Sequence, residues 1–383
     1  MGTTLRIIIT LLLLSGVSSA GTIYDTLRPT GGDYNSLDDF LLGADNVSTN
    51  DTLVLVIGDY PWGAEDAVSA NNIDNRTIGD GGLVLIRHEG GDYHTSGIWK
   101  DAAGADSHYV ALVAGNILDF EEGPYKFDGV QFKSYATDGY IYIGSNGPPD
   151  LVDSLVFDNC IFNWIKDILE GYNTTYSTHF YFRNCVFFDT SYQDAATDPV
   201  FYVPDNMNKD SIWVFNSVFH GVSGICNAKG LGTDAPEMFF VNCVFDSIGD
   251  MWRYDQSAFE ASADSNVFVN YCTFSDTATG FFSFTIGPDT NFQNCTFQQR
   301  DNLGFVDGVG PAANSFDFHI DGTGTATTDV GTDSEDFMIL GKITTDVDGT
   351  TRTNTWDIGI DDYATAAGAP TSTRRRKVLL GGR

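Results

Sequence analysis

Apolar and polar positions in the middle of the chain follow a short motif that recurs. It reads FDNCIF at 157–162, FRNCVF at 182–187, FVNCVF at 240–245 and FQNCTF at 292–297. Apolar residues alternate with other residues within each copy and no helical period is present, so the motif predicts short β-strands. The cysteine and the last phenylalanine of each copy are two positions apart, and we therefore expect both to point into a core.

Weaker copies fill the intervals between these motifs. They read FDGVQF at 127–132, FNSVF at 215–219 and NYCTF at 270–274. Successive copies are 23 to 32 residues apart, because the position of the cysteine moves through 130, 160, 185, 217, 243, 272 and 295. The Leu-x-Leu consensus of a leucine-rich repeat is absent, and the copies are closer together than the about 40 residues of a propeller blade. The pattern predicts an all-β fold, a right-handed parallel β-helix (a solenoid) in which each coil holds three short strands.

In a parallel β-helix the same position recurs about 4.8 Å above itself, so like residues form ladders. We expect the asparagine before each cysteine at a bend between two strands, where its amide bonds the asparagines above and below. An even number of cysteines in an exported protein also fits disulfides, but Ser217 occupies the cysteine position of one coil and argues against obligate pairing. We expect free, buried thiols at the five cysteines of the motif, which are Cys160, Cys185, Cys243, Cys272 and Cys295.

The N-terminus has the three regions of a secretory signal peptide. Arg6 precedes an apolar run, 7–14, and small residues close the segment at Ala20. The run is shorter than the roughly 20 apolar residues that span a bilayer, so a membrane anchor is the weaker interpretation. We expect cleavage after Ala20 and a secreted, extracellular protein that does not span a membrane.

The remaining segments complete the predicted organisation. After the signal peptide, 1–20, we expect an N-terminal capping segment at 21–50 and the β-helix itself at 51–325. We expect a β-rich closing segment at 326–363 and a disordered basic tail at 364–383.

The formal charge of -32 arises from 52 Asp and Glu against 20 Lys and Arg. Such a surface repels phosphate backbones, so we expect no nucleic-acid partner. Carboxylates also suit Ca²⁺, although an acidic surface that only maintains solubility explains the charge equally well.

The end of the chain carries a resemblance. The copies of the motif, which we call rungs, are followed by Asp346-x-Asp348-Gly349-x-x-Arg352 and Asp357-Ile358-Gly359. The segment GGDYNSLDDFLLG at 31–43 precedes them. Together these segments resemble right-handed β-helix proteins of the pectin-lyase-like superfamily, of the secreted or phage-encoded type. Where such proteins often have Ala-x-Glu-Tyr, this chain has 360–363, Ile-Asp-Asp-Tyr. The superfamily contains lyases, hydrolases, tailspikes and adhesins, so the resemblance implies a fold and leaves the activity open.

The resemblance also implies that a ligand lies along one exposed strand face, so we counted forward from the phenylalanine of each rung. Positions eight and ten residues further on are expected to face outward on the same side, because side chains alternate along a strand. The segment PVFYVP at 199–204 adds one tyrosine to this surface. The predicted site consists of Glu170, Tyr172, Tyr202, Asn227, Lys229, Arg253, Asp255, Phe282 and Phe284.

Three interpretations of this site compete. In a polysaccharide lyase, Arg253 and Lys229 would neutralise a uronate carboxylate, and Lys229 or Tyr172 would accept the α-proton in β-elimination. Glu170 or Asp255 would then hold Ca²⁺. In a structural shaft without a ligand, Lys229 and Asp255 would only form an exposed ion pair. Aromatic residues favour the third interpretation, a surface or tailspike-like protein that binds a polysaccharide or cell-surface glycan without turnover. A homo-oligomer is left open.

Overall fold

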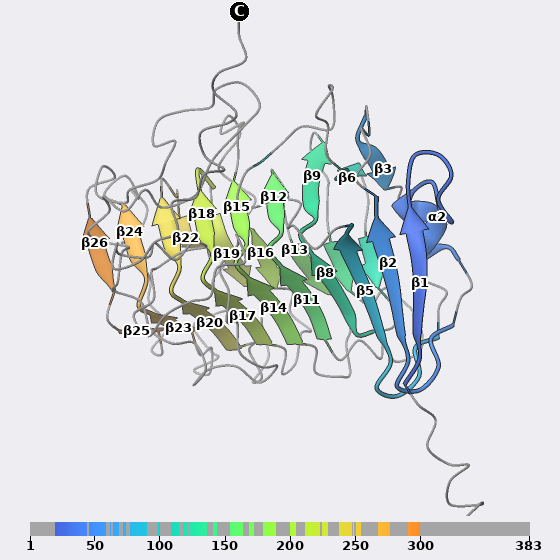
Figure 1. Ribbon diagram of the computed structural model, residues 1–383. Coiled ribbons are helices and arrows are strands. Elements are labelled where there is room, and N and C mark those ends of the chain that lie inside the picture. The colour runs from blue at the N-terminus through green and yellow to red at the C-terminus, as the bar shows by residue number, and fades with distance from the viewer. Residues whose placement is uncertain are drawn as a thin grey trace, which may run out of the picture.

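The fold was analysed in a computed structural model (Figure 1). The structure describes part of the chain between Ala20 and Gln298, as the ranges 20–43, 46–58, 62, 64–68, 72–73, 77–89, 99, 109–114, 118–120, 123–135, 141–143, 154–163, 168–171, 179–188, 200–203, 211–222, 224–228, 237–246, 248, 250–253, 267–275, 290–293 and 295–298. The predicted closing segment, 326–363, and the predicted tail, 364–383, lie outside these ranges.

Within the described ranges, the strands form three sheets in which every pair of neighbours is parallel. The ten-stranded sheet contains, in spatial order, β1 (Thr22–Leu27), β2 (Thr52–Ile57), β5 (Leu83–His88), β8 (Tyr125–Asp128), β11 (Ser154–Asp158), β14 (His179–Arg183), β17 (Ser211–Phe215), β20 (Glu237–Val241), β23 (Val267–Asn270) and β25 (Thr290–Gln293). The nine-stranded sheet contains β3 (Asp66–Val68), β6 (Val110–Ala114), β9 (Gln131–Tyr135), β12 (Ile161–Asn163), β15 (Val186–Phe188), β18 (Val218–His220), β21 (Val244–Asp246), β24 (Thr273–Ser275) and β26 (Thr296–Gln298). The seven-stranded sheet contains β4 (Asn72–Ile73), β7 (Leu118–Phe120), β10 (Ile141–Ile143), β13 (Ile168–Gly171), β16 (Phe201–Val203), β19 (Gly224–Ala228) and β22 (Asp250–Arg253).

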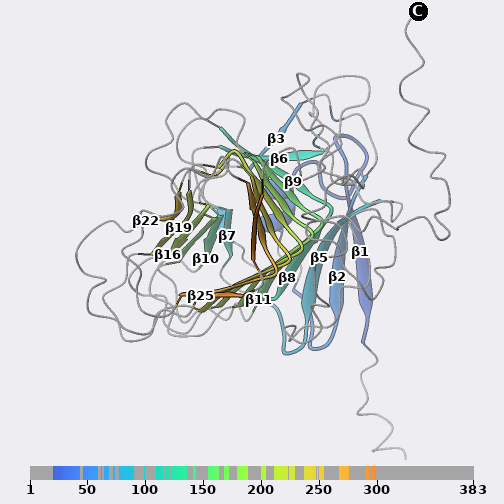
Figure 2. The same ribbon diagram turned by 90° about the vertical axis from the view of Figure 1, so that its left-hand side faces the viewer.

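The chain visits these sheets in a fixed order, and one visit to each sheet completes a coil. In the middle of the molecule, β11, β12 and β13 form one coil and β14, β15 and β16 form the next. The view in Figure 2 shows the three sheets arranged around a common interior. The predicted parallel β-helix with three strands per coil is therefore confirmed. Its right-handedness stays a prediction, supported by the strong preference of parallel crossover connections for that hand.

Phenylalanine rings fill the interior of the middle coils in two columns. On the nine-stranded sheet, consecutive rings stack with centroids 4.6 to 5.2 Å apart, from Phe132 through Phe162, Phe187, Phe219 and Phe245 to Phe274. On the ten-stranded sheet, the rings of Phe127, Phe157 and Phe182 stack in the same way and meet the first column edge to face. All these rings are at most 2 % exposed. The expected core position of the motif phenylalanines is thus confirmed.

In four consecutive coils, the asparagine of the motif forms the bend between the ten-stranded and nine-stranded sheets. Asn159, Asn184, Asn216 and Asn242 all have φ between 48° and 55°. This left-handed conformation is one that asparagine tolerates far better than most residues, which explains its recurrence at the bend.

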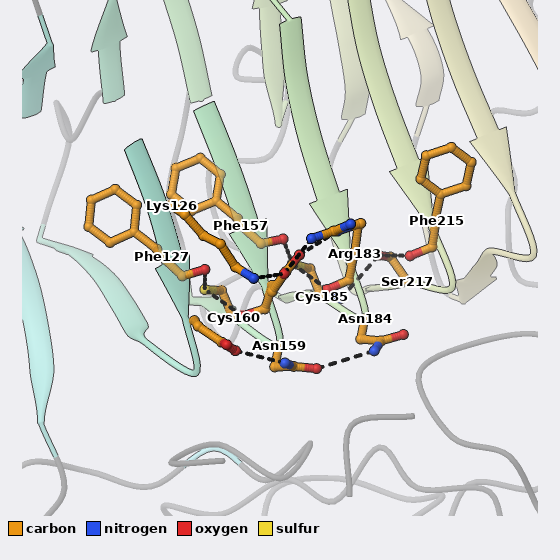
Figure 3. Close-up of polar contacts among 12 residues, drawn as sticks. Lys126, Phe127, Phe157, Asn159, Cys160, Arg183, Asn184, Cys185, Phe215 and Ser217 are labelled. Carbon is orange, nitrogen blue, oxygen red and sulfur yellow. Dashed lines mark hydrogen bonds and ion pairs between the residues drawn. The ribbon is translucent and has the colours of Figure 1, made fainter. Parts of the chain in front are cut away.

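The expected amide ladder forms in part. Asn184 Nδ2 donates to Asn159 Oδ1 at 3.2 Å (Figure 3). Asn242 Nδ2 donates to Asn216 Oδ1 at 3.1 Å. At the foot of the first pair, Asn159 donates to Asp128 Oδ1. Asn216 Nδ2 is buried and has no hydrogen-bond partner, so among the described residues the ladder is interrupted between Asn184 and Asn216.

The motif cysteines are free, as expected, and four of the five are fully buried. Cys160 Sγ and Cys185 Sγ lie within hydrogen-bonding distance of the carbonyls of Phe127 and Phe157 in the preceding coil. Burial raises the pKa of Cys160 and Cys272 well above the usual value for a thiol. These side chains therefore act as small apolar core residues with little thiolate character.

The predicted capping segment, 21–50, supplies the end strand β1 and a short helix, α2 (Leu37–Leu41). Ser36 caps this helix by accepting a hydrogen bond from Asp39 N, and the apolar side of the helix covers the end of the core. Asp66 of β3 accepts hydrogen bonds from Leu37 N at 2.8 Å and from Tyr109 Oη at 3.0 Å, which ties the helix to the first coils.

Candidate functional site

The seven-stranded sheet carries the part of the predicted site that the structure places. Tyr202 of β16 pairs in register with Asn227 of β19, and Asn227 pairs with Arg253 of β22. Residues paired in register share one face of a sheet. These three residues therefore lie in register on three consecutive strands of the sheet, one in each of three consecutive coils.

Glu170 takes a different place on the same sheet. It lies on β13 and pairs with Tyr142, whereas Ile141 pairs with Ile168, so Leu169 is an extra residue at an irregularity. Toward the other neighbour, the described pair is Ile168 with Phe201. Continued from that pair, the register aligns Leu169, and not Glu170, with Tyr202.

The other predicted site residues lie outside the described ranges. These are Tyr172, Lys229, Asp255, Phe282 and Phe284. The roles predicted for them, including proton abstraction by Lys229 or Tyr172, stay predictions.

The side chains that the structure describes contain no group of three or more His, Cys, Asp or Glu suited to a metal ion. The residues predicted to bind Ca²⁺, Glu170 and Asp255, are not among those side chains, so Ca²⁺ also stays a prediction. None of the helices in the described ranges is long and apolar enough to cross a membrane.

A second polar and aromatic surface, which the sequence analysis did not identify, lies on the outer face of the ten-stranded sheet. On β14, Phe180 and Phe182 point into the core, and alternation sends His179, Tyr181 and Arg183 to the opposite face. The same alternation defines an outer face on the neighbouring strands, which we call the outer aromatic face. Its central row consists of Val156, Tyr181, Trp213, Phe239 and Phe268, paired in register.

The rings of this row stack on one another. Trp213 and Phe239 have centroids 3.7 Å apart with planes 7° apart, and Phe239 and Phe268 are 4.8 Å apart. Tyr181 is only 2 % exposed and Trp213 is 9 % exposed. A sugar ring stacks on the flat face of an aromatic ring, but here those faces contact neighbouring rings, so the row is better suited to stabilising the coils than to binding glycan.

Polar side chains flank the aromatic row on one side. Trp213 Nε1 donates to Ser211 Oγ at 2.7 Å, and the same oxygen lies 2.6 Å from His179 Nδ1. Ser211 thereby links the tryptophan of its own strand to the imidazole of the preceding coil.

Beside the row, two cations converge on one carboxylate (Figure 3). Arg183 Nε and one terminal nitrogen each bond an oxygen of Asp158 at 2.5 Å, and Lys126 Nζ lies 2.7 Å from Asp158 Oδ2. Burial alone would raise the pKa of Asp158, but Arg183 and Lys126 outweigh it, so this pKa lies below the usual value. Burial and the charge of Asp158 raise the pKa of Asp128, the neighbouring carboxyl. Both cations are thus occupied within the protein, which leaves this cluster poorly suited to an anionic ligand.

The sequence did contain a signal for this surface. His179, Tyr181 and Arg183, and likewise Ser211 and Trp213, are alternate residues of the strand that precedes the asparagine bend. Reading the positions between the core phenylalanines, as well as those after them, would have found the row.

Comparisons with protein-family models, with curated proteins and with solved structures found no match to the chain. The assignment of a function therefore depends on the fold and on the two surfaces described above.

Proposed function

We propose that this protein is an exported β-helix shaft that binds an acidic glycan along its seven-stranded sheet. The observation that carries the proposal is the register of Tyr202, Asn227 and Arg253 on three consecutive strands. A tyrosine, an asparagine and an arginine in one backbone register would offer stacking, hydrogen bonds and a bidentate partner for a carboxylate. A row that runs along the coil axis fits a linear polymer better than a compact ligand.

Charge is the reason for choosing an acidic glycan. The chain has 52 acidic residues and 20 basic ones, so most of its surface repels anions. Arg253 and the nearby Lys229, which follows Asn227 by two positions, would provide local attraction on such a background. The remaining predicted residues, Tyr172, Asp255 and the pair Phe282 and Phe284, would extend the same face.

Membership of the pectin-lyase-like superfamily is part of the proposal. Its support is the three-sheet parallel coil together with the left-handed asparagine bend, which agree with the motifs that carried the resemblance. Glycan-binding and glycan-cleaving proteins both occur in that superfamily. The same face would also serve a lyase.

Binding to a panel of uronate-containing oligosaccharides, measured by calorimetry, tests the proposal. Arg253→Ala should weaken binding about ten-fold or more, because a charge-assisted contact contributes about 1.5 to 3 kcal/mol. Arg87→Ala is the matched control, since Arg87 is an exposed arginine on β5 of the ten-stranded sheet, and it should leave affinity unchanged. Equal affinity of the two variants would reject the seven-stranded sheet as the binding face.

The same samples separate binding from cleavage. Growth of the absorbance band of unsaturated uronates, with Ca²⁺ present, would identify a lyase and reject the simple binder. A panel that shows neither binding nor absorbance change would leave only the structural shaft.

A further inference from the structure

One edge of the end strand β1 does not pair with another strand, and the chain itself covers only half of that edge. In a strand, the backbone N–H and C=O of one residue point to the same side, and successive residues alternate. Gly21 O accepts a hydrogen bond from Thr52 N, and Leu27 O accepts one from Gly58 N. The backbone N–H and C=O groups of odd-numbered residues of β1 therefore point toward β2. The backbone groups of even-numbered residues point outward, away from β2.

The chain covers the second half of this edge itself. Thr26 N donates to Asp33 Oδ2 at 2.8 Å, and Thr26 O accepts from Tyr34 N at 3.0 Å. Arg28 N donates to Tyr34 O at 3.1 Å. A Cβ at Gly32 would lie 2.9 Å from both Arg28 N and Thr26 O, so glycine is needed where the chain returns this closely.

The first half of the edge stays open. No described residue bonds the outward backbone groups of Thr22 or Tyr24, and Tyr24 is 62 % exposed. Ile23 pairs in register with Leu53 and through it with Val84, both of which are buried in the core, yet Ile23 is 45 % exposed. The interior row of the sheet thus ends at an apolar residue that nothing in the described structure covers. Figure 1 and Figure 2 both show β1 at the end of the ten-stranded sheet.

We infer that two copies of this chain join edge to edge through Thr22–Tyr24 of β1, antiparallel and about a two-fold axis. Open strand edges are the usual sites of such pairing, and Thr22–Tyr24 contains none of the proline, charged residues or bulges that protect edges. A two-fold contact needs only one self-complementary surface, which makes a second copy the simplest partner.

The covered half of the edge fixes the register. Thr26 is already bonded, so Thr22 and Tyr24 are the residues with backbone groups to offer, and Thr22 of one copy lies opposite Tyr24 of the other. Each of these two pairs exchanges its N–H and C=O bonds, as in an antiparallel ladder. Ile23 then faces Ile23 of the second copy across the axis, and the two exposed interior rows close against each other.

The same register explains why the dimer would belong to the exported protein. It places Thr26, with Asp33 and Tyr34 beside it, opposite position 20 of the second copy. If the predicted signal peptide is removed after Ala20, the second copy has no residue there and no clash arises. The inference rests on that cleavage and is independent of the glycan proposal.

Electrostatics add a measurable signature. Each copy carries a formal charge of -32, so the two shafts repel each other at long range. Screening by salt should therefore strengthen the dimer, in contrast to an association held by ion pairs.

The test uses the chain that begins at Gly21, studied by sedimentation equilibrium over a range of concentrations and salt. A dimer is expected, with tighter association at higher ionic strength. Tyr24→Pro removes one outward N–H without touching a bond to β2, so it should abolish the dimer and leave the circular dichroism spectrum unchanged. A strictly monomeric parent chain, or a Tyr24→Pro variant that still dimerises, overturns the inference.

Disulfide trapping tests the register separately. Cα atoms of a directly opposed, non-hydrogen-bonded antiparallel pair lie about 4.5 Å apart, within the range that a disulfide bridges. Ile23→Cys should therefore give a cross-linked dimer under mild oxidation. Tyr24→Cys is the matched control, because its counterpart is displaced by two residues along each strand, and it should not cross-link. Cross-linking through position 24 and not through position 23 would overturn the proposed register.

Discussion

The N-terminal coils and the middle coils share one fold but stabilise it differently. Around β1, β2 and β5, the interior is aliphatic, with Leu55, Val84 and Ile86 fully buried, and the ion pair of Arg28 with Glu89 is 31 % and 44 % exposed. In the middle coils the interior is aromatic, and the pair of Arg183 with Asp158 is only 12 % and 11 % exposed. Regular stacking is thus accompanied by a nearly buried ion pair, whereas the Arg28–Glu89 pair of the less regular coils is partly exposed.

The bends differ in the same way. After β11, β14, β17 and β20 of the middle coils, asparagine follows the strand of the ten-stranded sheet in a left-handed conformation. In the N-terminal coils, the left-handed residues Asn50 and Gly81 come before β2 and β5. The same residue recurs at the bend only where the coil geometry recurs. The motif can therefore be recognised in the sequence only in those coils.

Removing one arginine from each region should give the largest difference between them in the free energy of unfolding. Arg183→Ala leaves Asp158 nearly buried, and we expect a loss of about 3 kcal/mol in the free energy of unfolding. This lies at the low end for a broken buried pair because Lys126 still contacts Asp158. Arg28→Ala removes an exposed pair and should cost about 0 to 1 kcal/mol. Chemical denaturation of both variants measures the difference, and equal losses would contradict the contrast.

The pH dependence of stability should also separate two carboxyls, Asp158 of the middle coils and Asp66 beside the cap. The folded pKa of Asp158 is lowered, so its contribution is present above the unfolded value, about 3.9, and is lost as pH falls through the folded pKa. Burial raises the pKa of Asp66 beside the cap, so its contribution is present below about 3.9 and is lost as pH rises through the folded pKa.

Melting curves between pH 3 and pH 7 would measure both effects. Asp158→Asn should reduce the acid sensitivity of the chain, and Asp66→Asn should raise relative stability toward neutral pH. If Asp158→Asn left the acid limb unchanged, the buried ion cluster would not be a source of acid sensitivity.

How much the sequence predicts follows from the same contrast. The rung motif predicted the parallel coil, the phenylalanine column and the free cysteines, because a core position is restricted in the same way in every coil. The cluster of Asp158, Arg183 and Lys126 escaped, since these residues are 25 and 32 positions apart and become neighbours only once the register is known. Spacing between coils varies, so distance along the chain does not reveal such pairs.

The candidate site shows the same limit at a single residue. Counting from the rung phenylalanine aligned Asn227 with Arg253 because both coils have the same number of residues between the two strands. Glu170 follows an irregularity that the count did not include, because Leu169 is an extra residue where β13 pairs with β10. Local irregularities of this kind depend on packing around one strand and leave no mark in the sequence pattern.

The smallest expected effect concerns a bend at which tyrosine replaces the asparagine of the motif. Tyr271 occupies the asparagine position with φ of 52°, a conformation that costs an ordinary L-residue about 1 kcal/mol or more. Tyr271→Asn should therefore raise the free energy of unfolding by about 1 kcal/mol, making this coil resemble its neighbours. Tyr271→Ala is the control, since alanine loses the ring and keeps the Cβ that disfavours this conformation, and it should bring no gain. If alanine stabilised the protein as much as asparagine, the strain would come from the tyrosine ring and not from the backbone, and the bend would carry no preference for asparagine.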